Sequence, residues 1–130
     1  MARLDELPDW EREHHLQKIR DLPDFGATPW VQGPPLARRK VALVTTAGLQ
    51  VRGDLPFRAG SSDYRVIPRD TPAADIVMSH LSVNYDRTGF QEDINVVLPV
   101  DRIRELHEQG VVGALAEYDY SFMGAASITA

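Results

Sequence analysis

The feature that most constrains the fold is a short apolar run, KVALVTTA, at residues 40–47, which ends in small polar residues before Gly48. A continuous apolar segment of this length is typical of a strand buried on both faces, as in a parallel sheet. Other short apolar or alternating segments are predicted to be strands: residues 63–68, 75–83, 94–98 and 113–122. The predicted fold class is therefore α/β, with a small, mostly parallel sheet.

Two segments are predicted to be helices. Residues 8–20 carry acidic residues early and basic residues late, an order that suits the helix dipole. Residues 100–110 place apolar side chains on one face and end at Gly110, a residue suited to a helix C-terminus. Because so few helices leave the faces of a sheet uncovered, we expect a partner chain or an oligomer to complete it.

The organisation along the chain suggests two parts. Residues 1–39 hold the N-terminal helix and a proline-rich connector, and residues 40–130 form the α/β domain. The last residues, MGAASITA, carry no helix and no obvious closure of the sheet. We therefore expect that another chain completes this one, or that it is a piece of something longer.

Composition excludes several classes of function. The net charge of −5 and the pI near 5.3 argue against nucleic acid or an anionic membrane as the main partner. No run of about eighteen apolar residues is present, and the acidic N-terminus lacks the pattern of a secretory signal, so the cytoplasm is expected. The 130 residues contain no cysteine, which excludes disulfides, thiolate metal sites and a cysteine nucleophile carried by this chain.

Polar side chains concentrate in the loop at residues 84–95, directly after the predicted strand that contains His80. An aspartate in this loop can orient the imidazole and tune it as a general acid or base. The predicted catalytic residues are His80, Asp86 and Asp93, and the predicted substrate-binding residues of the loop are Tyr85 and Asn95. The spacing of these side chains is not diagnostic of a metal site, so no metal is expected.

Hydroxyl groups outside the loop form a second set of candidates. Thr45 and Thr46 follow the buried strand, where ligands of open α/β sheets commonly bind, although a plain turn also explains them. Ser61 and Ser62 can bind an anion together with Arg65, although capping or turn formation is the simpler explanation. All four hydroxyl residues are predicted to bind substrate.

Three segments together resemble a known family: KVALVTTAGL, SSDYRVIP and SHLSVNYDRTGFQEDINVVLPVDRIRELHEQGVVGALAEYDYSFMG. They resemble the selenoprotein B family of glycine, sarcosine, betaine and D-proline reductases. The resemblance runs from about residue 40 to residue 124 and centres on the histidine-containing strand and the YDRTGF loop.

The resemblance implies an α/β fold and reductive cleavage of a carbon–nitrogen bond in an amino acid or its N-methyl derivative. It also implies that a selenocysteine or cysteine attacks the substrate and that a partner subunit carries a pyruvoyl group. This sequence departs from the pattern because it contains no cysteine. The residues to which the resemblance assigns the substrate side are Thr45, Thr46, His80, Tyr85, Asp86, Asp93 and Asn95.

Three functional hypotheses follow. The favoured one is a subunit or fragment of a reductase-like enzyme that acts on a small amino acid or N-substituted amine, with the redox cysteine or selenocysteine on another chain. It implies no cofactor in this chain, a pyruvoyl group or a Cys/Sec residue in a partner, and a second subunit or a homo-oligomer. The alternatives are a cysteine-free acid/base enzyme that uses His80 with Asp86 or Asp93, and a non-catalytic binding or assembly module.

Overall fold

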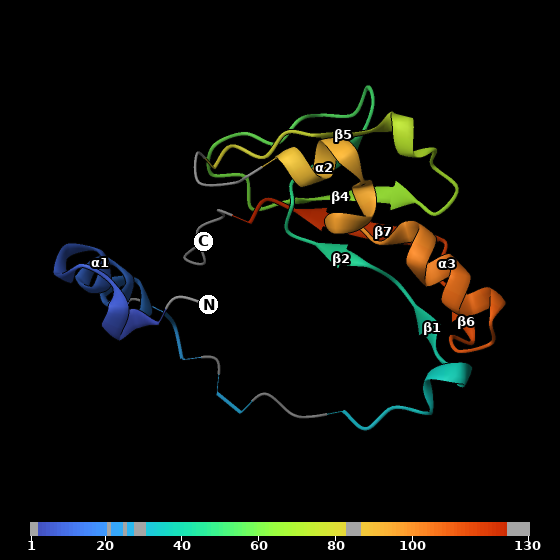
Figure 1. The fold of residues 1–130 in the computed structure, drawn as a ribbon, viewed down its shortest axis with the longest axis horizontal. Coiled ribbons are helices and arrows are strands. Elements are labelled where there is room, and N and C mark those ends of the chain that lie inside the picture. Colours follow the sequence, from blue (N-terminus) through green and yellow to red (C-terminus); the bar gives the residue numbers. More distant parts are fainter. Residues whose placement is uncertain (1–2, 21, 25, 28–30, 83–86, 125–130) are drawn as a thin grey trace. The chain divides into compact units, whose positions relative to one another are not determined.

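The computed structural model describes residues 3–20, 22–24, 26–27, 31–82 and 87–124, and the chain divides into two compact units between Val31 and Gln32 (Figure 1). That division falls inside the predicted proline-rich connector. The first unit contains a 3-10 helix, Leu4–Glu6, and α1, Asp9–Arg20.

Helix α1 confirms the helix predicted at residues 8–20. Acidic residues occupy its first turn, where the partial positive charge of the helix N-terminus is stabilising. Two ion pairs lie along α1: Arg12 to Asp9, one turn apart, at 2.6 Å and Arg20 to Glu13, two turns apart, at 3.1 Å. These pairs are exposed, and each therefore contributes little to stability.

Among its described residues, the second unit contains short strands and two α-helices. The strands are β1 (Lys40–Val41), β2 (Val44–Thr45), β3 (Leu49–Val51), β4 (Tyr64–Pro68), β5 (Ile76–Met78), β6 (Ala114–Leu115) and β7 (Tyr118–Phe122). The helices are α2 (Thr88–Glu92) and α3 (Val100–Glu108), with 3-10 turns at Leu36–Arg38, Ala73–Asp75 and Ile94–Val96.

Strand β7 lies between β2 and β4 in a three-stranded sheet, and β1 pairs with β6 and β3 with β5 (Figure 1). The β1–β6 and β2–β7 pairings are parallel, whereas β4–β7 and β3–β5 are antiparallel. The predicted α/β class with few helices and small sheets is confirmed. The sheets are mixed, so the expectation of mostly parallel pairing is met only in part.

Several predicted strands have different bounds. The segments 40–47 and 113–122 were each predicted as one strand, and each is divided in two. One reason is that the Leu43 N–H between β1 and β2 donates to the Asp119 carboxylate at 2.7 Å instead of joining a ladder. The strand predicted at 75–83 is shorter, since β5 ends at Met78.

The strand predicted at residues 94–98 is wrong, because Ile94–Val96 form a 3-10 turn. The Asp93 side chain accepts the Asn95 N–H and caps this turn, and Leu98 N–H donates to Ile94 O at 2.9 Å. The apolar residues still reach the core, since Leu98 is fully buried. Apolar character therefore predicted burial here, but not backbone conformation.

Helix α3 ends as the sequence predicted. Gly110 has a φ of 73°, and its N–H donates to His107 O at 2.9 Å. The next N–H, from Val111, donates to Leu106 O at 2.9 Å. These two bonds form a Schellman motif, for which glycine is the favoured residue.

The core of the second unit lies between the three-stranded sheet, the β3–β5 pair and the start of α3. It consists of Ala47, Leu49, Ile67, Ile76, Leu98 and Val100. Leu43, Met78 and Phe90 are among the partly buried side chains that pack against it. Within the described ranges, no helix combines the length and the apolar character that a membrane span requires.

Candidate functional site

His80 is buried just after β5, with 8% of its surface exposed. Its Nδ1 accepts the Ser82 N–H at 3.1 Å, and the Arg87 guanidinium donates to the His80 carbonyl at 2.6 Å. Burial, and secondarily the charge of Arg87, lower the pKa of His80 below its ordinary value. A neutral imidazole that accepts at Nδ1 carries its proton on Nε2, so His80 presents a hydrogen-bond donor at that atom.

Two glycines lie against His80 and allow three chain segments to meet there. A Cβ at Gly48 would lie 3.1 Å from the His80 Cα, and Gly48 also has a φ of 63°. A Cβ at Gly124 would lie 2.8 Å from the Thr46 carbonyl oxygen and 3.5 Å from His80 Nε2. We call this cluster of Thr46, Gly48, His80 and Gly124 the His80 corner.

Backbone hydrogen bonds assemble the His80 corner from the ends of β2, β5 and β7. Gly124 N–H donates to Thr46 O at 3.1 Å, and Ser79 N–H donates to Gly48 O at 2.9 Å. Gly48 N–H in turn donates to Phe122 O at 3.0 Å. The corner is therefore held by main-chain contacts, which tolerate side-chain variation around it.

Buried and partly buried polar contacts lie beside the His80 corner. The Ser79 hydroxyl donates to Gln50 Oε1 at 2.6 Å and accepts the Phe57 N–H at 2.9 Å. The Ser121 hydroxyl accepts the Leu49 N–H at 2.7 Å. These contacts hold β3 against β5 and β7. The sequence reasoning did not identify them, although the polar positions inside apolar strands were a usable signal.

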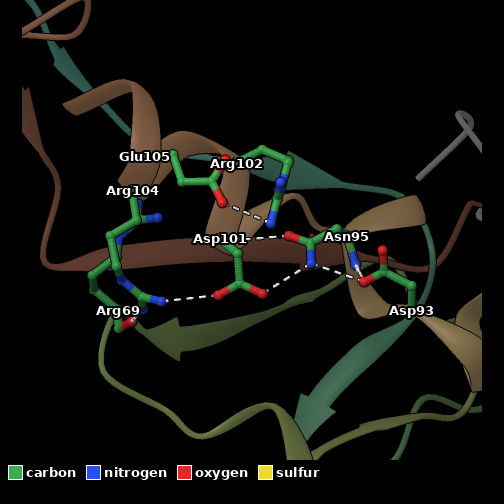
Figure 2. A network of polar contacts seen from close by, with 7 residues as sticks. All are labelled: Arg69, Asp93, Asn95, Asp101, Arg102, Arg104 and Glu105. Carbon is green, nitrogen blue, oxygen red and sulfur yellow. Dashed lines mark hydrogen bonds and ion pairs between the residues drawn. The ribbon is translucent and has the colours of Figure 1, made fainter. Parts of the chain in front are cut away.

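Asp93 and Asn95 form a separate network that joins the loop to α3 (Figure 2). The Asn95 amide donates to Asp93 at 2.8 Å and to Asp101 at 2.9 Å, and its oxygen accepts the Asp101 N–H at 2.9 Å. Arg104 pairs with Asp101 at 3.0 Å. The hydrogen bonds from Asn95 lower the pKa of Asp93. The network thus satisfies an N–H at the start of α3 and joins two chain segments.

The predicted site residues are consequently not all brought together. Thr46 meets His80 at the corner, whereas the contacts of Asp93 and Asn95 go to the α3 network. Asp86 and Tyr85 lie outside the described residues, so the pairing of His80 with Asp86 stays a prediction. A pairing with Asp93 also stays a prediction, but the described side-chain hydrogen bonds of Asp93 are both with Asn95.

The remaining hydroxyl candidates have local contacts. The buried Thr45 hydroxyl accepts the Ala47 N–H at 3.2 Å, and the Ser61 hydroxyl accepts the Arg58 N–H at 2.9 Å. Ser62 is exposed in the loop before β4. Arg65, the expected anion partner, donates instead to Leu55 O at 2.7 Å and pairs with an aspartate. Substrate binding by these residues stays a prediction.

A buried ion pair between Arg69 and Asp119 was also not identified from the sequence. Asp119 is fully buried, and its Oδ1 accepts from the Arg69 guanidinium and, at 2.7 Å, from the Leu43 N–H. Arg69 also donates to Ala116 O at 3.1 Å. Burial raises the pKa of Asp119, while the Leu43 N–H and Arg69 act in the opposite direction. The pair joins the Pro68–Tyr118 end of the β4–β7 pairing to the residue just before β2.

The chemistry available at the His80 corner is hydrogen bonding and proton transfer. Among the residues that the structure describes, no three His, Asp or Glu side chains are grouped to hold a metal ion. The 130 residues provide no thiol. A neutral histidine with a defined donor atom can bind a carboxylate or carbonyl oxygen, or exchange a proton with a substrate.

Comparison with known proteins identifies the family. The family model for glycine/sarcosine/betaine reductase selenoprotein B matches residues 9–130. The chain is 41% identical over 85 residues to D-proline reductase subunit gamma of Acetoanaerobium sticklandii. The aligned residues cover 65% of this chain and 34% of the relative. It is also 34% identical over 113 residues to glycine reductase complex component B subunit gamma of Symbiobacterium thermophilum. That alignment covers 79% of this chain and 25% of the relative.

A third relative is sarcosine reductase complex component B subunit beta of Peptoclostridium acidaminophilum, 37% identical over 95 residues, covering 68% of this chain and 21% of the relative. The chain therefore spans about a fifth to a third of the length of these curated relatives. No solved structure matches it. The match over residues 9–130 shows that this chain belongs to the glycine/sarcosine/betaine reductase selenoprotein B family.

Proposed function

We propose that this chain is part of a reductase of the selenoprotein B type and contributes its substrate side, while another chain contributes the redox residue. The family match over residues 9–130 supports the reductase assignment, together with relatives that are components of D-proline, sarcosine and glycine reductases. The 130 residues contain no cysteine, so in this proposal the redox residue is not among them.

The proposed reaction is the reductive cleavage of a carbon–nitrogen bond in a small amino acid or an N-substituted amine. Such a cleavage consumes two electrons and releases the amine. This chain has no thiol to supply those electrons. In the proposal a thiol or selenol of another chain supplies them and a partner subunit carries the pyruvoyl group. The residues of this chain bind and orient the substrate and hold protons.

His80 is the residue that carries the proposed substrate role. It is buried, its Nδ1 is occupied by the Ser82 N–H, and its lowered pKa favours the neutral imidazole at pH 7. In this form Nε2 donates a hydrogen bond to an oxygen of the substrate, such as its carboxylate. Gly124 lies beside both Thr46 and this atom, and the predicted residues Tyr85 and Asp86 follow in the sequence.

The first experiment isolates the chain from its source cells and identifies the subunits that accompany it. We expect a protein with a redox-active cysteine or selenocysteine to co-purify at fixed stoichiometry. The complex is then assayed with glycine, sarcosine, betaine and D-proline in the presence of a dithiol reductant. Isolation of the chain alone at its full mass, with no thiol-bearing subunit, would contradict the proposal.

A matched pair of variants tests the role of His80 in that complex. His80→Gln is expected to lower turnover by roughly 10²–10⁴-fold, the usual contribution of a positioned acid or base. His14→Gln, at an exposed position of α1, is the control and is expected to leave turnover unchanged. Equal turnover in the two variants would remove His80 from the mechanism. Turnover by the chain without any thiol would favour the alternative acid/base enzyme.

A further inference from the structure

Arg87 contacts the segment that contains His80 from the start of helix α2. Its Nη2 donates to the His80 carbonyl oxygen at 2.6 Å and to the Ser82 carbonyl oxygen at 3.3 Å. One guanidinium nitrogen therefore bridges two carbonyl groups that are two residues apart. Hydrogen bonds from a charged donor are roughly twice as strong as those between neutral groups. The bridge consequently fixes the direction of both carbonyl groups, and with them the backbone of residues 80–82.

The backbone of residues 80–82 in turn sets the hydrogen bonding of the imidazole. The Ser82 N–H donates to His80 Nδ1 at 3.1 Å. This bond requires the chain to turn between the two residues, and the Arg87 bridge spans the same two residues. A neutral imidazole that accepts at Nδ1 carries its proton at Nε2. Holding the turn therefore selects one of the two neutral tautomers of His80.

Both sides of this contact are anchored in the second unit. The Arg87 carbonyl oxygen accepts the Gln91 N–H at 3.1 Å, which joins Arg87 to the first turn of α2. Phe90 of that helix packs against the core. On the other side, a Cβ at Gly48 would lie 3.1 Å from the His80 Cα, so the backbone of His80 is closely packed. The Arg87 side chain thus connects two segments whose positions are set by packing.

The charge of Arg87 acts in the same direction as its hydrogen bonds. Burial chiefly lowers the pKa of His80, and the positive charge of Arg87 lowers that pKa further. A protonated imidazole carries a proton at Nδ1 and cannot accept the Ser82 N–H, so the neutral form and the turn support each other. The other described members of the His80 corner are uncharged: Thr46, Gly48 and Gly124.

We propose that Arg87 is a positioning residue for His80, which holds the turn at residues 80–82 so that the imidazole accepts at Nδ1 and carries its proton at Nε2. Arg87 acts through the backbone in this role. The use of the Nε2 proton toward a substrate oxygen rests on the proposed function, whereas the tautomer is a property of the chain itself. The competing explanation is that Arg87 only closes the loop between β5 and α2, in which case the tautomer does not depend on it.

The test is nitrogen-15 NMR of the purified chain, because two-bond proton–nitrogen correlations distinguish a protonated ring nitrogen from an unprotonated one. The chain has four histidines, and the signals of His80 are those that His80→Gln removes. We expect the neutral His80 of the wild type to be a single tautomer with its proton at Nε2. Arg87→Met is expected to lose this single tautomer, with signals of both forms or their average, and to shift the titration midpoint of His80 upward.

Arg52→Met is the matched control. Arg52 also donates to a backbone carbonyl, that of Ala74 at 2.7 Å, and it lies beyond the Val51–Ile76 end of the β3–β5 pairing, away from His80. This variant is expected to leave the tautomer and the titration midpoint of His80 unchanged. Arg87→Lys keeps the charge and a nitrogen that can donate to both carbonyl groups, so it is expected to keep the wild-type tautomer in most molecules.

Two results would overturn the proposal: a wild-type His80 that carries its proton at Nδ1, or an Arg87→Met variant that keeps the single Nε2-protonated form. If Arg87→Met does not fold, Arg87→Gln takes its place, because its side chain is uncharged and two atoms shorter. An unchanged tautomer in that variant would overturn the proposal in the same way.

Turnover in the reductase complex separates this inference from the proposed function. Arg87→Met is expected to lower turnover by less than the roughly 10²–10⁴-fold loss expected for His80→Gln, since the imidazole is still present. Suppose that neither variant changes turnover but Arg87→Met loses the single tautomer. The role of His80 in the proposed function is then contradicted, and the positioning of its imidazole by Arg87 is supported.

Discussion

Replacing Asp119 by alanine is expected to destabilise the second unit by about 4 kcal/mol. Asp119 is fully buried, and its Oδ1 accepts from the Arg69 guanidinium and from the Leu43 N–H. Alanine removes both acceptor interactions without offering a replacement. Arg69 then keeps its charge in a place with little water, since its side chain is only 13% exposed.

The magnitude follows from these two losses. Leaving one partner of a buried ion pair without the other costs roughly 3–5 kcal/mol. An unsatisfied buried N–H, here that of Leu43, costs about 1–3 kcal/mol when considered alone. The two costs overlap because the same relaxation can relieve both, so we take about 4 kcal/mol. Domains of this size are stable by about 5–15 kcal/mol, so the variant is close to unfolding.

The assay is urea unfolding followed by circular dichroism, with matched variants. Asp119→Asn keeps an oxygen acceptor for the Leu43 N–H but leaves the Arg69 charge uncompensated, so it is expected to lose about 3 kcal/mol, less than Asp119→Ala. The double variant Arg69→Met/Asp119→Leu is expected to be more stable than Asp119→Ala, because it leaves no unpaired charge. Glu105→Ala, which removes an exposed ion pair with Arg102, is expected to cost under about 1 kcal/mol.

A loss below about 1 kcal/mol in Asp119→Ala would contradict this expectation, because it would place the pair in water rather than in the interior. A double variant that is as unstable as Asp119→Ala would contradict only the role given to the unpaired charge. In that case packing of the two side chains, and not the unpaired charge, would account for the loss.

Three further predictions concern the His80 corner and the start of α3. The folded state lowers the pKa of His80. The stability that the wild type has relative to His80→Gln is therefore fully present above pH 6.5, the pKa of the unfolded chain, and is lost as the pH falls through the folded pKa. Unfolding at several pH values checks this. Gly124→Ala places a Cβ 2.8 Å from the Thr46 carbonyl oxygen and is expected to lower the free energy of unfolding by about 1–3 kcal/mol. Gly89→Ala is the control, because its Cβ would lie no nearer than 3.4 Å to another atom, and thermal melts compare the two variants. Asn95→Ala removes the acceptor for an N–H at the start of α3 and is expected to cost about 1–2 kcal/mol in urea unfolding, a result that an unchanged midpoint would contradict.

The extent to which the site was predictable differs from residue to residue. His80 could be singled out because a histidine at the end of a strand, next to a polar loop, is an unusual combination, and the structure buries it. The polar character of Asp93 and Asn95 was equally visible. Their hydrogen bonds to each other and to Asp101 were not, since these bonds depend on a turn that apolar residues 94–98 did not reveal.

Local sequence determined the elements whose stability is local. Helix α1, helix α3 with its glycine-terminated end, and strand β4 follow from charge order, apolar spacing and turn residues within a few positions of each other. The motifs were also sufficient to identify the family, which the match over residues 9–130 confirms.

Tertiary structure decided which polar groups are buried together and which apolar groups are left outside. Asp119 lies inside because Arg69, fifty positions earlier in the chain, and the Leu43 N–H compensate its charge. The aromatic residues of β7 then point outward, because strand alternation forces neighbours to opposite faces. A sequence shows the alternation but not which face is covered, since that depends on contacts between distant segments.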